Sequence, residues 1–326
     1  MNFLVIRFSS LGDVILTGPV FENLKLNYPG SFIYFLTKKN YAAVFRGSPF
    51  IDRVVVLEDF SFFGLIKFLK KIKPVRVFDL HASLRSRLVD LFFPGKVFRV
   101  NTYRAQRKRM LGGKTAMIPN AVERYLETLK KAGIKIHTAR PKLSPEASEK
   151  NKARGILSEL GIPVSSQIIC IAPQSKWKNK EWPHFEKFFE IAVKPGRFFL
   201  LAGDDFQKAE QIMPANRYIR NFVKNTCGSI GMGTLFAVLA LSRCVISMDS
   251  GVAHAASALG RPLIDFFGPT VPAFGFAPPE AKIMEVDVPC RPCHLHGGNV
   301  CKRGDRVCLG SISERELLEE VEKILR

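Results

Sequence analysis

The sequence predicts an α/β fold made of two Rossmann-like domains with mainly parallel sheets. Its 326 residues are more than one hydrophobic core usually organises, which favours two domains. In both halves, short apolar runs of strand length alternate with helical segments, a pattern typical of parallel sheets with right-handed crossovers. A polar stretch separates the halves. We therefore predict domains at 1–150 and 151–326, and expect that the final helix can pack back on the first domain.

The first half contains four apolar runs of strand length and two longer segments with helical periodicity. The expected strands are 3–8, 31–36, 54–57 and 75–80, and the expected helices are 60–71 and 83–93. After the first strand, Ser9 and Ser10 can cap a helix. The apolar face of that helix would consist of Leu11, Val14, Ile15, Gly18 and Phe21.

The second half repeats this alternation. The expected strands are 168–172, 198–202, 244–247 and 263–267, with helices beginning near positions 183, 205, 233 and 251. The intervening stretch 137–166 is richer in Ser, Pro, Glu and Lys, and we expect a helix over 146–160. Near the C-terminus, Ser313 and Glu316 form a capping-box pattern ahead of an apolar helical stripe.

Composition and charge limit the class of protein. Hydrophobic residues make up 47% and charged residues 24%, ordinary values for a globular protein. We see neither an apolar run long enough for a bilayer span nor a signal-peptide pattern, so we predict a cytoplasmic location. The net charge of +20 attracts polyanions such as nucleic acid, anionic membranes or phosphorylated substrates, although a basic surface can also be merely solvated. Aromatic residues are not interleaved with basic ones as in base-stacking proteins, so we expect no nucleic-acid partner.

Two common nucleotide-binding fingerprints fail. Lys114 and Thr115 follow a glycine, but Lys108 stands where a P-loop needs its first glycine. The glycines within 228–233 do not form a spaced dinucleotide fingerprint after a strand. The chain is therefore predicted to be neither a P-loop enzyme nor an ordinary dehydrogenase.

The loops after the strands are the candidate sites, because ligands of doubly wound sheets bind beyond the carboxyl ends of the strands. The loop 7–13 places hydroxyls and amides at a helix N-terminus, which suits a phosphate or a developing negative charge. Asp13 is placed to accept a proton from an acceptor hydroxyl. It can equally serve only to favour the helix dipole.

Two strand-to-helix loops in the second half have phosphate-binding chemistry. The loop 173–183 presents three lysines and Ser175 beside a helix opened by proline, and lysine can neutralise a leaving diphosphate. The alternative is a merely exposed basic loop. The loop 248–254 contains Gly251, which lets the backbone approach a ligand closely. His254 follows one turn later, where a lone histidine is more often a packing or capping residue.

Four motifs occur in order along the chain. They are Ser9-Ser10-Leu11-Gly12-Asp13-Val14, Ser175-Lys176-Trp177 with Lys180 and Trp182-Pro183, Asp249-Ser250-Gly251 with His254, and Phe267-Gly268-Pro269-Thr270. Together they resemble the ADP-heptose:lipopolysaccharide heptosyltransferases, glycosyltransferase family 9. The resemblance spans nearly the whole chain. It implies the GT-B architecture, in which two Rossmann-like domains face each other across a cleft, with the acceptor on the N-terminal half and the donor on the C-terminal half.

The resemblance also implies roles for single residues. Asp13 would be the general base of an inverting transfer, and Lys180 would neutralise the donor diphosphate. The implied donor-binding residues are Ser10, Ser175, Asp249, Ser250, Gly251 and His254. No metal is expected in catalysis, and the alternative function is a GT-B glycosyltransferase with another nucleotide sugar and acceptor. The chain departs from the family pattern at Gln174, where many relatives have glycine, and in the loop 203–207, which lacks the usual glutamate.

The implied acceptor is a lipid A-linked core oligosaccharide, an acidic sugar at the anionic inner face of the cytoplasmic membrane. We expect Arg85 and Arg87 to meet acceptor carboxylates, since both follow a strand end. A further basic loop is expected to engage the acceptor or the membrane surface, and the alternative is a disordered loop that is merely soluble. It consists of Arg104, Arg107, Lys108, Arg109 and Lys114. The partners predicted are therefore an ADP-sugar, the core acceptor and, peripherally, the membrane.

Four of the seven cysteines crowd into one stretch. They are Cys290, Cys293, Cys301 and Cys308. Their spacing is compatible with a structural zinc site that staples a long loop, although it matches neither common zinc-finger spacing. Reduced thiols or a local disulfide are the alternatives. The other three cysteines lie in apolar surroundings typical of small core residues.

Overall fold

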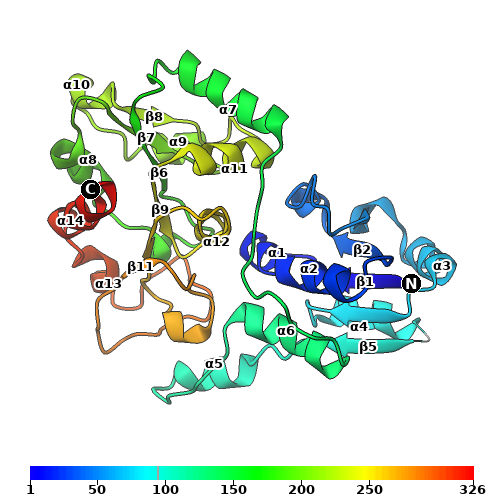
Figure 1. Cartoon of the computed structure of the whole chain (residues 1–326). Helices are drawn as coiled ribbons and strands as arrows, with labels where there is room; N and C mark the ends of the chain where they lie inside the picture. The colour runs from blue at the N-terminus through cyan, green and yellow to red at the C-terminus, as the bar shows by residue number, and fades with distance from the viewer. Residues whose placement is uncertain (94) are drawn as a thin grey trace. The chain divides into compact units, whose positions relative to one another are not determined.

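The computed structural model describes residues 1–93 and 95–326, which form two compact units (Figure 1). The first unit comprises 1–103 and 119–144, and the second comprises 104–118 and 145–326. The division differs from the expected single boundary after residue 150, because the segment 104–118 groups with the second unit. Within that unit, the guanidinium of Arg107 lies 5.0 Å from the ring centre of Phe276.

The first unit is built on a five-stranded parallel sheet in the order β3-β2-β1-β4-β5. Its strands are β1 (Asn2–Ile6), β2 (Phe32–Thr37), β3 (Arg53–Val56), β4 (Arg76–Asp79) and β5 (Lys96–Arg99). Its helices are α1 (Leu11–Ile15), α2 (Gly18–Asn27), α3 (Phe62–Ile72), α4 (Leu84–Leu91) and α6 (Ala121–Lys131). The central strand β1 is fully buried from Phe3 to Ile6, as expected for a parallel strand covered on both faces.

The expected first helix is two helices, α1 and α2. The break lies at Leu16 and Thr17, directly before Pro19. Proline lacks an amide hydrogen, and its ring clashes with the carbonyl four residues earlier, so α1 cannot continue through it. The apolar face predicted from the spacing is nevertheless present, because Val14, Ile15 and Phe21 are buried.

The second unit is built on a six-stranded parallel sheet in the order β11-β10-β9-β6-β7-β8. Its strands are β6 (Gln167–Ala172), β7 (Arg197–Leu201), β8 (Val223–Asn225), β9 (Cys244–Met248), β10 (Leu263–Phe266) and β11 (Lys282–Met284). Its helices are α5 (Arg104–Met110), α7 (Ala147–Glu159), α8 (Phe185–Ala192), α9 (Phe206–Glu210), α10 (Arg217–Arg220), α11 (Met232–Leu241), α12 (Gly251–Ala258), α13 (Val307–Gly310) and α14 (Glu314–Leu325). Helices α11 and α12 lie on one side of this sheet, and α8 and α14 on the other (Figure 1).

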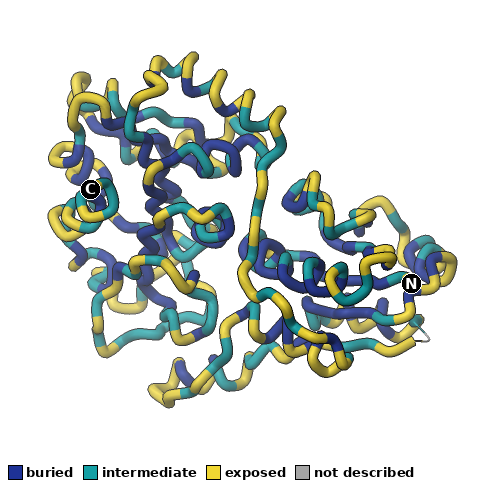
Figure 2. Tube along the Cα trace, in the orientation of Figure 1, coloured by how far each residue is buried: buried dark blue, intermediate teal, exposed yellow. Residues whose placement is uncertain are grey.

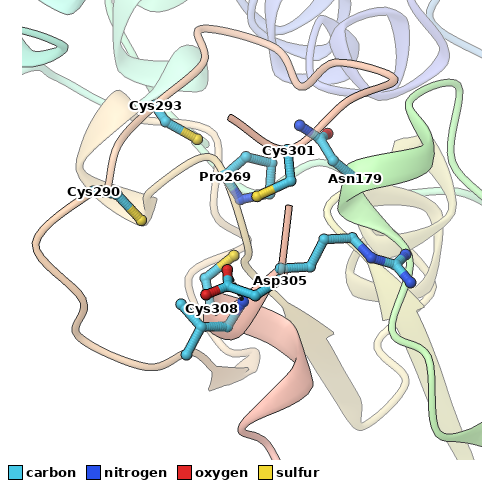
Figure 3. Close-up of a pocket in the computed structure, with 9 residues that line it drawn as sticks. Asn179, Pro269, Cys290, Cys293, Cys301, Asp305 and Cys308 are labelled. Atoms are coloured by element: carbon cyan, nitrogen blue, oxygen red, sulfur yellow. Dashed lines mark hydrogen bonds between the residues drawn. The ribbon is translucent and has the colours of Figure 1, made fainter. Parts of the chain in front are cut away.

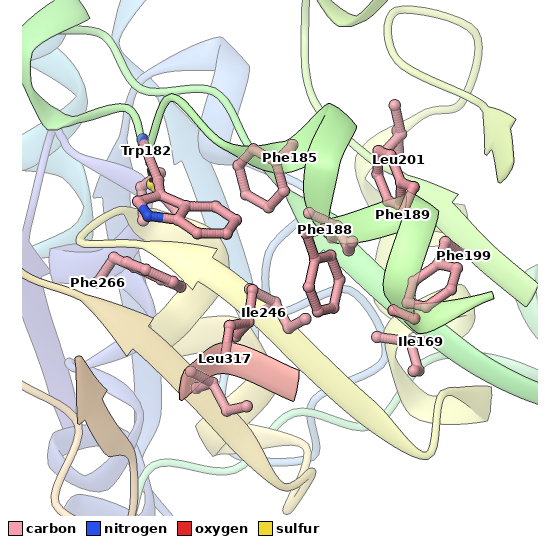
Figure 4. Close-up of a cluster of buried hydrophobic side chains, with 14 of the residues drawn as sticks. Ile169, Trp182, Phe185, Phe188, Phe189, Phe199, Leu201, Ile246, Phe266 and Leu317 are labelled. Atoms are coloured by element: carbon pink, nitrogen blue, oxygen red, sulfur yellow. Dashed lines mark hydrogen bonds between the residues drawn. The ribbon is translucent and has the colours of Figure 1, made fainter. Parts of the chain in front are cut away.

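An aromatic cluster forms one side of the core of the second unit (Figure 4). Trp182 packs against Phe185 and Phe266, with ring centres 4.9 and 5.2 Å apart. The final helix α14 begins at the expected capping box of Ser313 and Glu316. Its Leu317 is buried in this cluster, and α14 packs against α8 of its own unit. We had expected that this helix could pack on the first domain. In both units the central strands are buried and the outer helix faces are exposed (Figure 2).

The predicted basic loop is in part a helix. Residues 104–110 form α5, and its Arg107 is buried over Phe276. Arg107 therefore cannot serve as an exposed contact for an anionic partner. The remaining four basic residues of the segment are exposed: Arg104, Lys108, Arg109 and Lys114.

Candidate functional site

The second unit has a topological switch point between β6 and β9. These strands are neighbours, but the chain continues from β6 toward β7 on one side and from β9 toward β10 on the other. The two connections diverge there and leave room for a ligand at the carboxyl ends of the strands. The loop 173–184 after β6 and the loop 249–250 after β9 both begin at this edge.

Lys180 and Asp249 form the central contact at this edge. The Lys180 Nζ lies 2.5 Å from Asp249 Oδ2, and the two side chains are 8% and 16% exposed. The Thr270 hydroxyl, from the loop after β10, donates to the same oxygen at 2.6 Å. Lys176 and Lys178 in the same loop are exposed. The structure therefore singles out Lys180 among the three lysines as a buried cation held by a carboxylate.

Asp265 is a second acid near this pair. It lies on β10, and its side chain is buried. Burial raises the pKa of Asp265 well above its usual value, the negative charge of Asp249 raises it further, and Lys180 opposes the shift. Burial therefore disfavours the charged form of Asp265, and Asp249 is the carboxyl group that contacts Lys180.

The other donor-site candidates cap or follow helices of the second unit. Ser250 is the N-cap of α12: its hydroxyl accepts from the Val252 amide at 3.3 Å and lies 3.1 Å from the Ser247 hydroxyl. Gly251 is the first residue of α12, and His254 is buried in its first turn. Ser175 donates its amide to Glu181 at 2.8 Å. Ser250, Gly251 and His254 thus lie at the N-terminus of α12, and a helix N-terminus favours an anion.

Gln174 connects the two segments at which the chain departs from the family pattern. Its amide oxygen accepts from the backbone amides of Asp204 and Asp205 at 3.1 Å each, and its amide nitrogen donates to the Asp205 carbonyl. The residue thus joins the loop after β6 to the loop after β7. A Cβ at Gly203 would come within 2.4 Å of the Gln174 oxygen. The unusual glutamine and the unusual loop 203–207 are therefore one linked feature.

The first unit has its own switch point, between β1 and β4. Arg7, after β1, donates to the Leu80 carbonyl after β4 at 2.6 Å, which ties the two loops together. Its guanidinium also lies 2.6 Å from Asp13 Oδ2. Burial alone would lower the pKa of Arg7, but the neighbouring Asp13 raises it. Asp13 is thus paired with a permanent cation.

Tyr125 and Ser10 complete the surroundings of Asp13. The Tyr125 hydroxyl, from α6, donates to Asp13 Oδ1 at 3.0 Å, and the Ser10 hydroxyl donates to Oδ2 at 3.0 Å. Burial raises the pKa of the Tyr125 phenol, so it stays a donor. Both oxygens of Asp13 are therefore oriented by side chains from two elements, while the carboxylate keeps 17% of its surface exposed.

Arg85 and Arg87 lie in the first turn of α4, at the same edge of the first sheet, and both are exposed. Beneath them, the buried Asp79 accepts from the amides of His81 and Ala82 at 3.0 and 2.8 Å. Burial and then the charge of Arg7 lower the pKa of His81 to about 4. The hydrogen bonds of Asp79 thus fix the turn that leads into the helix with the two arginines.

Sequence reasoning missed several residues at these sites. Arg7 stood in the motif that carries Asp13 but received no role. Tyr125 lies 112 residues from Asp13, on a helix that the sequence analysis did not predict. Asp265 was hidden inside an apolar strand, although a single acid in such a run is itself a signal of an unusual carboxyl group.

Comparison with known proteins gives the family. The family model for glycosyltransferase family 9 (heptosyltransferase) matches residues 65–298, well over half of the chain. The chain belongs to glycosyltransferase family 9. It is 24% identical to lipopolysaccharide heptosyltransferase 2 of Escherichia coli K12, in an alignment that covers all of this chain and 99% of that protein.

Solved structures agree with the fold of this family 9 chain. A family 9 glycosyltransferase from Veillonella parvula matches with a TM-score of 0.81 and 21% identity, over 99% of this chain and 97% of that one. The E. coli ADP-heptose lipopolysaccharide heptosyltransferase II matches with a TM-score of 0.77 and 22% identity, over 100% and 98%. The predicted GT-B class, with two Rossmann-like domains, is confirmed, and the chain is a glycosyltransferase. Among the described residues, we find no helix with the length and apolarity needed to cross a membrane.

Proposed function

We propose that this enzyme transfers a heptose from ADP-heptose to the inner core of lipopolysaccharide, with inversion at the anomeric carbon. The observation that carries the proposal is the buried Lys180–Asp249–Thr270 cluster at the switch point of the second sheet, in a chain of family 9. The matched relatives are heptosyltransferases, and the alignment with lipopolysaccharide heptosyltransferase 2 of Escherichia coli covers 99% of that protein. Their names supply the donor and acceptor classes, and the cluster supplies chemistry suited to a departing diphosphate.

In the proposed reaction, Asp13 accepts the proton of an acceptor hydroxyl. The oxygen of that hydroxyl attacks the anomeric carbon as the bond from that carbon to the β-phosphate oxygen breaks, and ADP leaves. Negative charge grows on the diphosphate, and a preorganised cation and backbone amides stabilise such charge best. Lys180 and the amides at Ser250 and Gly251 take this role in the proposal, while Asp249 contacts the donor sugar.

The contacts of Asp13 suit a positioned base. Arg7 pairs with the carboxylate, and Tyr125 and Ser10 donate hydrogen bonds to its two oxygens. An acceptor hydroxyl would replace one of these donors when it binds, since catalytic hydrogen bonds form fully only in the complex with substrate. Arg85 and Arg87 are proposed to bind acidic groups of the acceptor.

The test is transfer from ADP-heptose to a panel of truncated core acceptors. With Asp13→Asn, we expect kcat to fall by about 100-fold or more, since general base catalysis contributes on the order of 10²–10⁴, while ADP still binds. Tyr125→Phe, which removes only an orienting hydroxyl, should have a smaller effect on kcat. Full activity in Asp13→Asn would remove this residue as the base and leave the donor assignment standing.

Donor competition tests the alternative nucleotide. The second candidate is a GT-B transferase that uses another nucleotide sugar. It is favoured by Gln174 and the loop 203–207, where the chain departs from the family pattern and a nucleoside contact is expected. For an ADP-heptose enzyme the competition has a clear expected result. ADP should inhibit transfer far better than UDP or GDP. If UDP or GDP inhibited more strongly than ADP, the donor would be a UDP- or GDP-sugar and not ADP-heptose.

Peripheral binding to the inner membrane surface is part of the proposal, and an exposed apolar surface on the first unit supports it. We call it the α3–α4 patch; it consists of Phe62, Phe63, Leu84, Leu88, Leu91 and Phe92. Phe63 and Leu91 are 78% and 76% exposed, and the rings of Phe62 and Phe92 join the two helices at 5.5 Å. Exposed lysines and arginines of the same helices flank it: Lys67, Lys70, Lys71, Arg85 and Arg87. Exposed apolar side chains on helices that also carry exposed cations suit an anionic lipid surface.

Vesicle co-sedimentation tests this surface. Phe63→Ser with Leu91→Ser should weaken binding to vesicles containing anionic lipid, whereas Val164→Ser, at a fully exposed position of the second unit, should not. The Michaelis constant for a lipid-free acceptor should be unchanged in the patch variant. Equal vesicle binding by the patch variant and the control would contradict the assignment.

A further inference from the structure

The four clustered cysteines, separated by up to 18 positions in the sequence, line one small pocket of the second unit (Figure 3). The pocket lies beside Asn179 and Pro269, and Cys308 is buried while the other three cysteines are half-buried. The thiol groups of Cys290, Cys293, Cys301 and Cys308 all point into the same space (Figure 3). All four are free thiols in the structure. Four thiolates around one point are the donor set of tetrahedral zinc and iron sites.

The loop that carries these cysteines is long and irregular. Residues 285–306 connect β11 to α13 without regular secondary structure, and loops of this length usually need a specific reason to be ordered. Arg291 supplies part of the order by donating to the carbonyls of Val286, Gly268 and Thr270. In the half that contains Cys301, the Gly304 amide donates to the Cys301 carbonyl at 3.0 Å and the Val307 amide to Asp305 at 3.2 Å. These contacts join residues close in sequence, so a bound ion would add a link between the two halves of the loop.

The charges around the pocket suit a tetrathiolate site. A divalent ion with four thiolates has a net charge of −2, so its binding is favoured by nearby cations. The same loop carries four basic residues: Arg291, Lys302, Arg303 and Arg306, and Arg306 lines the pocket. Asp305 also lines it, paired with Arg303 at 3.0 Å.

We infer that Cys290, Cys293, Cys301 and Cys308 together bind one thiophilic divalent transition-metal ion, zinc or iron, which fixes the loop 285–306 against the Lys180–Asp249 cluster. In the described part of the chain, no three or more His, Cys, Asp or Glu side chains are already gathered as metal ligands. The thiols would therefore have to turn and move inward to reach metal–sulfur distances of about 2.3 Å. The role of the ion is structural, and the inference goes beyond the proposed transfer reaction.

The backbone contacts of this loop connect it to the donor site. Asn179, next to Lys180, donates its amide to the Gly298 carbonyl at 3.0 Å, and its side chain accepts from the Gly298 amide at 2.8 Å. The Cys293 amide donates to the Pro269 carbonyl at 3.0 Å, one residue before the Thr270 that holds Asp249. An ion bound between the cysteines would thus restrain the loops that position Lys180 and Asp249.

The first test is the metal content of the full chain, purified without chelator or an affinity tag that binds metal. We expect about one zinc or iron per chain by mass spectrometry. After exchange with Co²⁺, the visible absorption should be that of tetrahedral cobalt thiolate. Cys293→Ser with Cys301→Ser should lose the ion, while Cys244→Ala, which removes a buried thiol outside the pocket, should keep it.

Three results would overturn the inference. They are less than about a tenth of an equivalent of any thiophilic metal after supplementation of the growth medium, full metal content in the double serine variant, and a disulfide between two of the four cysteines in freshly purified protein. The cobalt spectrum and the metal content are measured on the unmodified chain, so misfolding of a variant does not affect them. Neither depends on transfer activity, so a failure of the proposed function would be distinguishable from a failure of the metal site.

Discussion

Replacement of Lys180 by methionine tests whether the buried ion pair is the centre of the donor site. The change removes the ammonium 2.5 Å from Asp249 and keeps most of the side chain's volume. Breaking a buried pair by deleting one partner usually costs about 3–5 kcal/mol of stability. Here Asp249 is 16% exposed and keeps its hydrogen bond from Thr270. We therefore expect a smaller loss, about 2 kcal/mol in the free energy of unfolding.

Urea unfolding followed by tryptophan fluorescence measures this loss, because both tryptophans, Trp177 and Trp182, lie in the second unit. Adding Asp249→Asn to Lys180→Met should recover part of the stability, since the uncompensated carboxylate is then gone. Lys178→Met is the matched control in the same loop. Its side chain is exposed, and we expect a change within about 0.5 kcal/mol.

The effect on catalysis should be larger than the effect on stability. Removing one preorganised group that stabilises developing charge typically lowers kcat by about 100- to 1000-fold, or about 2.7–4 kcal/mol. Steady-state transfer rates at saturating donor measure this. The reasoning is refuted if Lys180→Met keeps kcat within about threefold of the wild type, or if it loses no more stability than Lys178→Met.

Three further predictions concern single contacts. Gly203→Ala should destabilise the chain by about 1–2 kcal/mol by displacing the Gln174 amide from its hydrogen bonds. In a Gln174→Ala background the same change should cost little. If the losses from the two substitutions were additive in urea unfolding, this account would be contradicted. Hydrogen bonds from Arg197 and then Lys194 lower the pKa of Glu322 to about 2, below its ordinary 4.5. The stabilisation from these contacts is therefore complete above about pH 4.5 and is lost as the pH falls toward 2. Glu322→Gln should have a flatter pH dependence of unfolding in that window, and a slope identical to that of the wild type would count against a stabilising role of these hydrogen bonds. Burial and then the charge of Arg7 lower the pKa of His81 from 6.5 to about 4. As the pH drops from 6.5 to 4, the unfolded chain binds the proton before the folded chain does, so stability should fall. His81→Asn should reduce this dependence of stability on pH in thermal unfolding followed by circular dichroism, and an unchanged dependence would exclude His81 as its source.

The alternation of strands and helices could be predicted from the sequence because its signals are local. Apolar runs such as 168–172 and 244–247 predict buried parallel strands, and the structure contains β6 and β9 there. The edge strands β5, β8 and β11 were missed because they are short and partly exposed, whereas the edge strand β3 lies where 54–57 was predicted. A run of three or four residues with intermediate burial gives too little periodicity to distinguish it from a loop.

The motif loops could be predicted from the sequence, but their contacts could not. Position at a strand end drew attention to Asp13, Lys180 and Asp249. The partner of Lys180 lies 69 positions away, and Tyr125 approaches Asp13 across 112 positions. Contacts of this kind depend on the order of strands in the sheet, which no local pattern contains. The basic segment 104–114 shows the same limit, because burial of Arg107 depends on Phe276 far along the chain.

The contact between Gln174 and Gly203 also constrains how this chain could have diverged. A side chain at 203 would push the Gln174 amide from its present place against the backbone of Asp204 and Asp205, so glutamine at 174 keeps these contacts unchanged only beside a glycine. With both present, substitution of Gly203 disturbs the contacts of Gln174. The two positions therefore behave as one heritable unit, and a loop exchange between relatives that moves one without the other should give a poorly ordered hybrid.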